Sequence, residues 1–391
     1  MNDLNNANFY YNKGVELHTN GNKVEAETYY KKALEVNQEH ASAHNNLASL
    51  LNEQGNKIEA ETHFRRVLRI NPKAVDTHYN LAVLLEEQGN EIEAAKHYRK
   101  AIELNSKYVR AHHALAFLLY KQGDKVGTEQ HYRKAIELNP KDITLRGNLA
   151  NFLNEQGNKI EAEKHYRKVL DMNPKAVDTH YNLAILLNGQ GNKIEAEKHY
   201  RKALEINPNE VNAHNELAIL LKEQGNKVEA EVHFRQTLKI NPNNAPAHHN
   251  LASFLKEQGN KIEAEKHYRK ALDMNPKDVD SHYNLANLLY AKGKKVEAEA
   301  HHRKALEINP EHANAHNNLA FILRERGDMV GAEEYHRKVL EINSENASAY
   351  HGMAKADSGN ILSHDIQLSC KHWKNTLQGI ICVDDPSEEF E

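Results

Sequence analysis

Ten glycines recur at a constant spacing of 34 residues through most of this 391-residue chain. They are Gly21, Gly55, Gly89, Gly123, Gly157, Gly191, Gly225, Gly259, Gly293 and Gly327. A period of this length is typical of repeat proteins, in which one short element cannot bury its apolar face alone and packs against the next copy. With the glycine at position 15 of each repeat, repeat one begins at residue 7 and repeat ten ends at residue 346. The spacing therefore predicts an elongated array of ten repeats.

Each repeat has the pattern of two helices joined by a short turn. In repeat two, Leu47 and Leu51 are apolar at helical spacing, and Gly55 is expected to end the first helix with a positive φ. Asn56 is expected to cap the second helix. A proline at position 32 prevents that helix from continuing. It occurs as Pro72, Pro140, Pro174, Pro208, Pro242, Pro276 and Pro310.

Small and large residues recur at fixed positions of each repeat, in a pattern that resembles the motif of the tetratricopeptide repeat family. Repeat three shows the motif as His78, Leu81, Ala82, Leu85, Ala94 and Tyr98. The resemblance implies an all-α fold, a right-handed α-solenoid superhelix of ten 34-residue helix-turn-helix repeats. One departure is constant, because position 4, usually Trp in the family, is His or Tyr here and Arg146 in repeat five.

Four segments are expected along the chain. Residues 1–6 are a lead-in, 7–346 are the ten repeats, 347–381 are C-terminal capping helices, and 382–391 are an acidic, disordered tail. One capping helix is predicted over residues 364–381, where apolar side chains form one helical stripe that would cover the open end of the stack. The stripe consists of Ile366, Cys370, Trp373, Leu377 and Ile381.

A longer period is superposed on the repeats. The string NPKAVDTHYNLA occupies residues 71–82 and again 173–184, and NPKDVDSHYNLA follows at 275–286. These copies are 102 residues apart, which is three repeats. We interpret this period as the duplication of three-repeat blocks.

Position 6 of the repeat carries the candidate binding residues. In the family the first helix of each repeat lines the concave face, so position 6 is expected to face a groove. It is asparagine in eight repeats, namely Asn12, Asn46, Asn80, Asn148, Asn182, Asn250, Asn284 and Asn318. An asparagine amide can pair with both the C=O and the N–H of one peptide group, so a column of them could hold an extended chain by its backbone. The alternative is that these side chains bond to the neighbouring repeat and only stiffen the stack.

Strings such as AHNNLASLLNEQGN (43–56) and AHNNLAFILRERGD (315–328) resemble the superhelical region of the O-linked N-acetylglucosamine transferase family. That resemblance implies a substrate-binding ladder made by the eight asparagines. It also implies a contribution from aspartates at position 2, which match only at Asp76, Asp178 and Asp280. Only 45 residues follow residue 346, too few for a glycosyltransferase module, and no catalytic motif is found, so no enzymatic activity and no cofactor are expected. A carboxylate clamp of the chaperone-binding type, as the family has it, is not expected, because it needs lysine at position 5 and no repeat has one.

Histidines form two columns, at position 4 and at position 23. Equivalent residues of adjacent repeats should lie about 10 Å apart, too far to share one metal ion. No metal site is therefore predicted, and the histidines are expected to pack or to lie at the surface. Buried, neutral histidines at position 4 should have a lowered pKa.

Composition narrows the class of partner. The net charge of −4, from 51 basic and 55 acidic residues, gives no large basic field, so neither nucleic acid nor a membrane is expected as a partner. The first residues lack the features of a signal peptide, and the two cysteines exclude a disulfide framework for the repeats, which predicts a cytoplasmic or nuclear location. The favoured function is a non-catalytic scaffold that binds extended protein segments in the asparagine-lined groove. The alternatives are a superhelix that recruits substrates for a separate enzyme, and a structural element that self-assembles into homo-oligomers.

Overall fold

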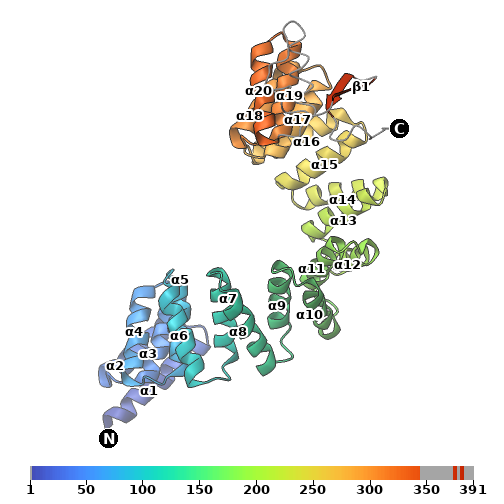
Figure 1. Ribbon diagram of the computed structural model, residues 1–391. Helices are drawn as coiled ribbons and strands as arrows, with labels where there is room; N and C mark the ends of the chain where they lie inside the picture. Colours follow the sequence, from blue (N-terminus) through green and yellow to red (C-terminus); the bar gives the residue numbers. More distant parts are fainter. Residues whose placement is uncertain (1, 344–372, 377–378, 383–391) are drawn as a thin grey trace. The chain divides into compact units, whose positions relative to one another are not determined.

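The computed structural model of the protein describes residues 2–343, 373–376 and 379–382 (Figure 1). Residues 2–343 form twenty helices in ten pairs, which confirms the predicted α-solenoid of ten repeats. The chain divides into two compact parts, Met1–Asn192 and Lys193–Glu391, which we call the N-terminal part and the C-terminal part.

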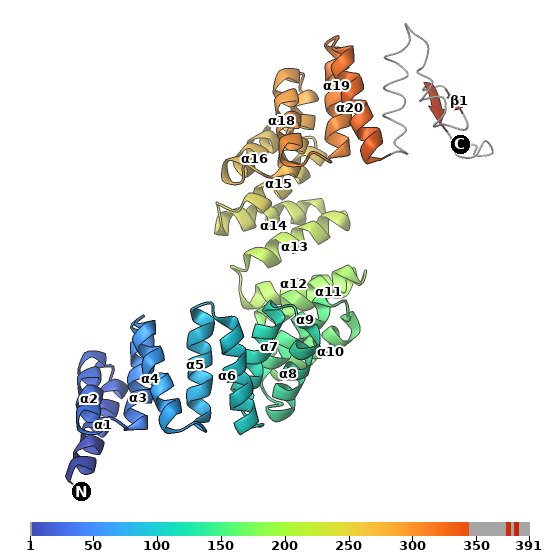
Figure 2. The ribbon, with the colours of Figure 1, turned by 60° about the vertical axis from the view of Figure 1, so that its left-hand side comes forward.

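The N-terminal part holds α1 to α11. These helices are α1 (Asn2–Thr19), α2 (Lys23–Val36), α3 (Ala41–Glu53), α4 (Lys57–Ile70), α5 (Val75–Glu87), α6 (Glu91–Leu104), α7 (Val109–Lys121), α8 (Lys125–Leu138), α9 (Ile143–Glu155), α10 (Lys159–Met172) and α11 (Val177–Gly189). Figure 2 shows how the helix pairs from α1 to α6 follow one another in chain order.

The C-terminal part holds α12 to α20 and two short strands. The helices are α12 (Lys193–Ile206), α13 (Val211–Glu223), α14 (Lys227–Ile240), α15 (Ala245–Glu257), α16 (Lys261–Met274), α17 (Val279–Tyr290), α18 (Lys295–Ile308), α19 (Ala313–Glu325) and α20 (Met329–Ile342). The strands are β1 (Trp373–Thr376) and β2 (Gly379–Cys382).

The turn inside each repeat depends on its glycine. All ten period glycines have φ between +77° and +91°, a left-handed conformation that side chains with a Cβ rarely adopt. In repeat two, Gly55 N–H bonds to Asn52 O at 3.0 Å and Asn56 N–H bonds to Leu51 O at 2.8 Å, which satisfies the last carbonyls of α3. Asn90 accepts a cap hydrogen bond from Glu93 N–H, whereas the side chain of Asn56 makes none.

The core runs between the helices of successive repeats. Leu47, Leu51 and Leu81 are completely buried, and Phe64 from a second helix packs into the same cluster. The alanines at position 8 of the first helices, such as Ala48, have no exposed surface. Small residues at these points let helix backbones approach closely, and this packing fixes which side of each first helix remains open.

Both ends differ from the predictions. α1 already begins at Asn2, so the segment predicted to precede repeat one continues directly into its first helix, a feature that the sequence analysis did not predict. The helix predicted over 364–381 is wrong at its C-terminal end, because 373–376 and 379–382 are antiparallel strands paired Trp373↔Cys382 and Thr376↔Gly379. Aromatic and β-branched residues are frequent in these strands, and they favour a pleated backbone over a helix. The remaining predictions for 344–372 and 383–391 lie outside the described residues.

Candidate functional site

The asparagines of position 6 lie on the first helices, half-buried except for Asn12, which is exposed. Three of them donate an amide hydrogen to the position-5 side chain of the preceding repeat. These bonds are Asn46 Nδ2 to Tyr11 Oη at 3.3 Å, Asn148 Nδ2 to His113 Nε2 at 2.9 Å and Asn250 Nδ2 to Asn215 Oδ1 at 3.0 Å.

Three further position-6 asparagines bond to other positions of the preceding repeat. Asn182 Nδ2 donates to Asn151 Oδ1 at 3.1 Å, Asn318 Nδ2 donates to Asn287 Oδ1 at 2.8 Å, and Asn284 Oδ1 accepts from Lys256 Nζ at 2.8 Å. The column thus links repeats through side chains. Asn46 also has a side-chain hydrogen bond with Tyr30. In the other four donors, no described residue bonds to the amide oxygen, so a carbonyl acceptor and one amide hydrogen remain for another partner.

The three aspartates of position 2 are all exposed but differ in their surroundings. Asp76 Oδ1 accepts a hydrogen bond from Tyr108 Oη at 2.8 Å. Burial and this carboxylate together raise the pKa of Tyr108. Within the described chain, Asp178 and Asp280 make no hydrogen bond or ion pair, so their carboxylates are available to a ligand.

Two adjacent cavities lie in the N-terminal part and were not foreseen from the sequence. One, of about 340 Å³, is bordered by α9, α10 and α11 around Gly147. The other, of about 150 Å³, is lined by aromatic side chains of α7, α8 and α9. Asn148 and Asn151 line both cavities. The sequence signal was Gly147, the one small residue at position 5 of any repeat.

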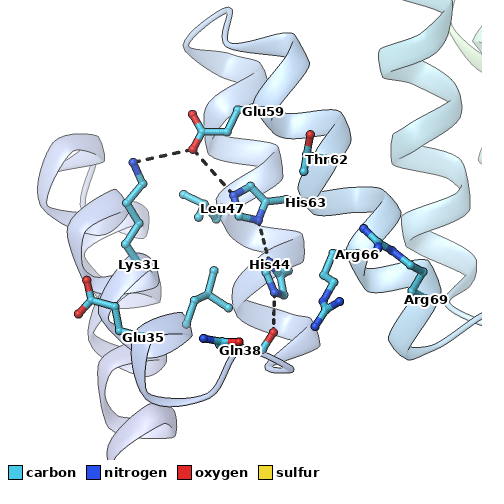
Figure 3. A pocket seen from close by; sticks show the side chains of 11 residues that line it. Lys31, Glu35, Gln38, His44, Leu47, Glu59, Thr62, His63, Arg66 and Arg69 are labelled. Carbon is cyan, nitrogen blue, oxygen red and sulfur yellow. Dashed lines mark hydrogen bonds and ion pairs between the residues drawn. The ribbon is translucent and has the colours of Figure 1, made fainter.

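The two histidine columns meet wherever one repeat has a histidine at both position 4 and position 23, a pairing that the sequence analysis missed. His44 Nδ1 lies 2.7 Å from His63 Nδ1, and His44 Nε2 donates to Gln38 O at 3.0 Å (Figure 3). His44 must therefore accept at Nδ1, and His63 must donate from its own Nδ1. The same bond, at 2.7–2.9 Å, joins five more pairs: His78–His97, His112–His131, His214–His233, His248–His267 and His282–His301.

The geometry of these pairs is that of a hydrogen bond. The ring centroids of His44 and His63 are 4.9 Å apart with the two Nδ1 atoms between them, so the rings face each other head-on. A shared metal ion would require both lone pairs to converge on a point to one side. In the part of the chain that the structure describes, no three His, Cys, Asp or Glu side chains gather around a point where an ion could bind.

Burial controls the protonation of the pairs. The predicted lowering of the pKa is confirmed for the position-4 histidines His44, His78, His112, His214, His248 and His282, with burial as the main cause. In the partner column, burial and then the nearby charge of His78 lower the pKa of His97 to about 4. Glu93 opposes this shift, because its Oε1 lies 3.9 Å from His97 Nε2.

No helix within residues 2–343 combines the length and the hydropathy that a membrane crossing needs. Several arginines of the second helices pair with glutamates, as in Arg65 with Glu61 and Glu93, both at 2.7 Å. These ion pairs offset much of the charge on the second helices.

Comparison with known proteins places the repeats in one family. Models described as tetratricopeptide repeat match residues 7–40, 39–107, 141–209, 176–243 and 303–334, and a model described as TPR repeat matches 92–123. The middle TPR-like domain of cilia and flagella-associated protein 70 matches 216–318. No curated protein matches the chain.

Solved structures share the fold at low sequence identity. The C-terminal part of a TPR repeat-containing protein from Cytophaga hutchinsonii is 17% identical, with a TM-score of 0.54 over 62% of this chain and 99% of that one. The Cut9–Hcn1 hetero-tetramer of the APC/C gives 15% identity and a TM-score of 0.50 over 90% of this chain and 76% of that one. At these identities the likeness concerns the fold alone.

Proposed function

Because the chain belongs to the tetratricopeptide repeat family, we propose that it is a non-catalytic scaffold that binds extended or disordered segments of other proteins. The segments lie along the open side of the first helices, over the asparagine column. The proposed role includes no cofactor, and the location proposed with it is the cytoplasm or the nucleus.

One observation carries the proposal. Four asparagines of the column, Asn148, Asn182, Asn250 and Asn318, have their amide plane fixed by donation to the preceding repeat, and each keeps an unpartnered Oδ1 and a second amide hydrogen. Such an amide is oriented in advance to accept from a peptide N–H and to donate to a peptide C=O. Stiffening of the stack and binding of a ligand are therefore compatible roles for the same side chain.

The strength of such binding is limited. Each net hydrogen bond contributes about 0.5–1.5 kcal/mol, while ordering the ligand costs about 1–2 kcal/mol per residue. Because the asparagine amides are already fixed, little free energy is needed to order the protein, but the cost of ordering the ligand is unchanged. The proposal therefore entails micromolar affinity for any one short segment, with tighter binding when several repeats are engaged.

The test is affinity capture of partners from an extract with the wild type and with Asn80→Ala/Asn148→Ala/Asn182→Ala. Bound segments are then synthesised, and their affinities are measured by fluorescence anisotropy. Asn22→Ala/Asn56→Ala is the matched control, because those turn asparagines are exposed and make no side-chain cap bond. We expect the triple variant alone to lose binding while its circular dichroism is unchanged. A folded triple variant that retains every partner would show that the column is only structural.

Two alternatives have their own readouts. If the chain recruits substrates for a separate transferase, as the resemblance to O-linked N-acetylglucosamine transferase suggests, a transferase should co-purify with it. If it is a self-assembling element, light scattering should give a mass above that of one chain.

A further inference from the structure

Gly147 interrupts a column of larger side chains. At position 5 the other nine repeats have Tyr11, Asn45, Tyr79, His113, Tyr181, Asn215, His249, Tyr283 and Asn317. A Cβ added to Gly147 would have no neighbour within 4 Å, so the space that a side chain could occupy is open.

The three-repeat period supplies two matched comparisons for this position. Asn45 Oδ1 accepts from Thr77 Oγ1 at 3.0 Å, and His249 Nδ1 bonds to Ser281 Oγ at 2.8 Å. Each pair joins position 5 of one repeat to the hydroxyl at position 3 of the next. In the middle copy of the period the corresponding residues are Gly147 and Thr179.

Because Gly147 has no side chain, the polar side chains around it cannot form the hydrogen bonds that position 5 makes in the two matched repeats. Thr179 is only 8% exposed, and its hydroxyl makes no hydrogen bond within the described chain. Asn182 turns to Asn151 instead of to position 5. The result is the cavity of about 340 Å³ at the junction of α9, α10 and α11, which we call the Gly147 pocket.

The polar lining of the Gly147 pocket is rich in acceptors. Asn148 and Asn182 each use an amide hydrogen on the protein and keep a free Oδ1, and Asp178 adds an exposed, unpaired carboxylate. Asn151 Oδ1 is already occupied, since it also accepts from Tyr166 Oη at 2.6 Å. Within the described chain Asp178 is the one charged residue in the lining, since no Lys, Arg or His lines the pocket, and the free acceptors can take a donor.

We propose that the Gly147 pocket is a specificity subsite of the groove, and that it takes the arginine side chain of a bound extended segment. Ile143, Val169 and Val177 provide apolar wall for the aliphatic stem of that side chain. A guanidinium group has five N–H donors in a planar fork and no acceptor, which matches acceptors that come from different helices. The subsite rests on the proposed function, because the arginine enters from a segment that the groove holds.

The probe is an array of unstructured peptides of about 15 residues, long enough when extended to cross several repeats. In the array, each residue position of the peptide is replaced in turn by arginine, lysine, glutamine, glutamate or leucine. The full-length protein is then applied to the array. We expect the wild type to select arginine at one position, with a loss of affinity of about tenfold on replacement by glutamine.

The decisive variant is Gly147→Tyr, which restores the side chain of repeats one, three, six and nine. It should reduce the preference for arginine over glutamine to less than about twofold while arginine-free peptides bind as before. Gly147→Ala is the matched control and should keep the preference, because a methyl group leaves most of the cavity open. Circular dichroism checks the folding of both variants, and a Cβ at Gly147 meets no heavy atom within 4 Å, so Gly147→Ala introduces no clash.

Three outcomes would overturn the subsite: a wild type that favours no residue, one that favours glutamate or leucine, and a preference for arginine that survives Gly147→Tyr. Failure of the proposed function is a separate result. It appears as unchanged binding of every peptide by Asn80→Ala/Asn148→Ala/Asn182→Ala. If the wild type binds no peptide on the array, both ideas are rejected.

Discussion

Acidification from about pH 7.5 to about pH 5 should destabilise the N-terminal part through its buried histidine pairs. His97 and His131 both have their pKa lowered to about 4, mainly by burial and then by the charge of the partner histidine. In the unfolded chain their pKa returns to about 6.5. Between these two values the unfolded state binds more protons than the folded state, so the free energy of unfolding decreases as the pH falls through 6.5 and levels off near 4.

The magnitude follows from the two pKa values. For a pKa of about 4 in the fold and about 6.5 in the unfolded chain, linkage gives a loss of about 2 kcal/mol per histidine at pH 5. Only 17% of the His97 side chain is exposed, so solvent screening reduces this little. Two such residues give about 4 kcal/mol, which lowers the melting temperature of a part of this size by roughly 8–16 °C. Glutamates such as Glu93 do not interfere, because an arginine hydrogen bond lowers the pKa of Glu93 below its ordinary value and it remains ionised at pH 5.

The assay is thermal unfolding followed by circular dichroism across this pH range. His97→Tyr/His131→Tyr is the matched variant, because tyrosine occupies position 23 in repeats one and ten, where Tyr29 packs near Tyr10 and Tyr335 near His316. On acidification, the melting temperature of the variant should fall by several degrees less than that of the wild type. A wild-type melting temperature that stays within about 2 °C over the range would refute the reasoning, since it would mean that the pairs accept protons without cost.

Three substitutions give further tests, each measured as the free energy of unfolding in denaturant. Gly147→Ala should raise it by about 0.5–1 kcal/mol, because a helix-interior glycine with open space around it gains helix propensity. Gly89→Ala should lower it by about 1–2 kcal/mol, because φ there is +82°. Burial alone would raise the pKa of Glu265, but hydrogen bonds from Lys292 and Arg269 hold it at about 2, so Glu265→Gln should cost about 1–3 kcal/mol at neutral pH and little below pH 2.

The solenoid could be predicted from the sequence because its signals are local and repeated. A residue such as Gly55 acts within one turn, where only glycine readily adopts the positive φ that lets two helices pack back to back. The burial of His44 could also be predicted, since position 4 lies on the apolar stripe of its helix. Ten copies of the same signal removed the ambiguity that one helical hairpin would have left.

Contacts between helices were harder to predict. The pairing of His78 with His97 joins residues 19 apart on two helices, and it depends on how far the helices slide along each other. The hairpin at 373–382 lies outside the repeats, so no period helped to distinguish helix from strand, and the apolar stripe proved compatible with both. For the same reason, the sequence could not decide whether Asn182 binds the backbone of a ligand or bonds to the neighbouring repeat.

The residues that break the repeat pattern carry information that the constant residues do not. A column that is nearly constant can be explained by packing alone, as with the buried alanines that occupy position 8 in nine repeats. An exception has to be explained by its own surroundings. At position 6, Glu216 replaces asparagine and accepts a hydrogen bond from Asn215, while burial raises the pKa of its carboxyl group, so the column there is altered in charge as well as in shape. At position 5, Gly147 leaves a cavity where two otherwise equivalent junctions are closed by a hydrogen bond. Since neither change is needed for the helices to stack, these junctions are where one solenoid of this family would differ from another in what it binds.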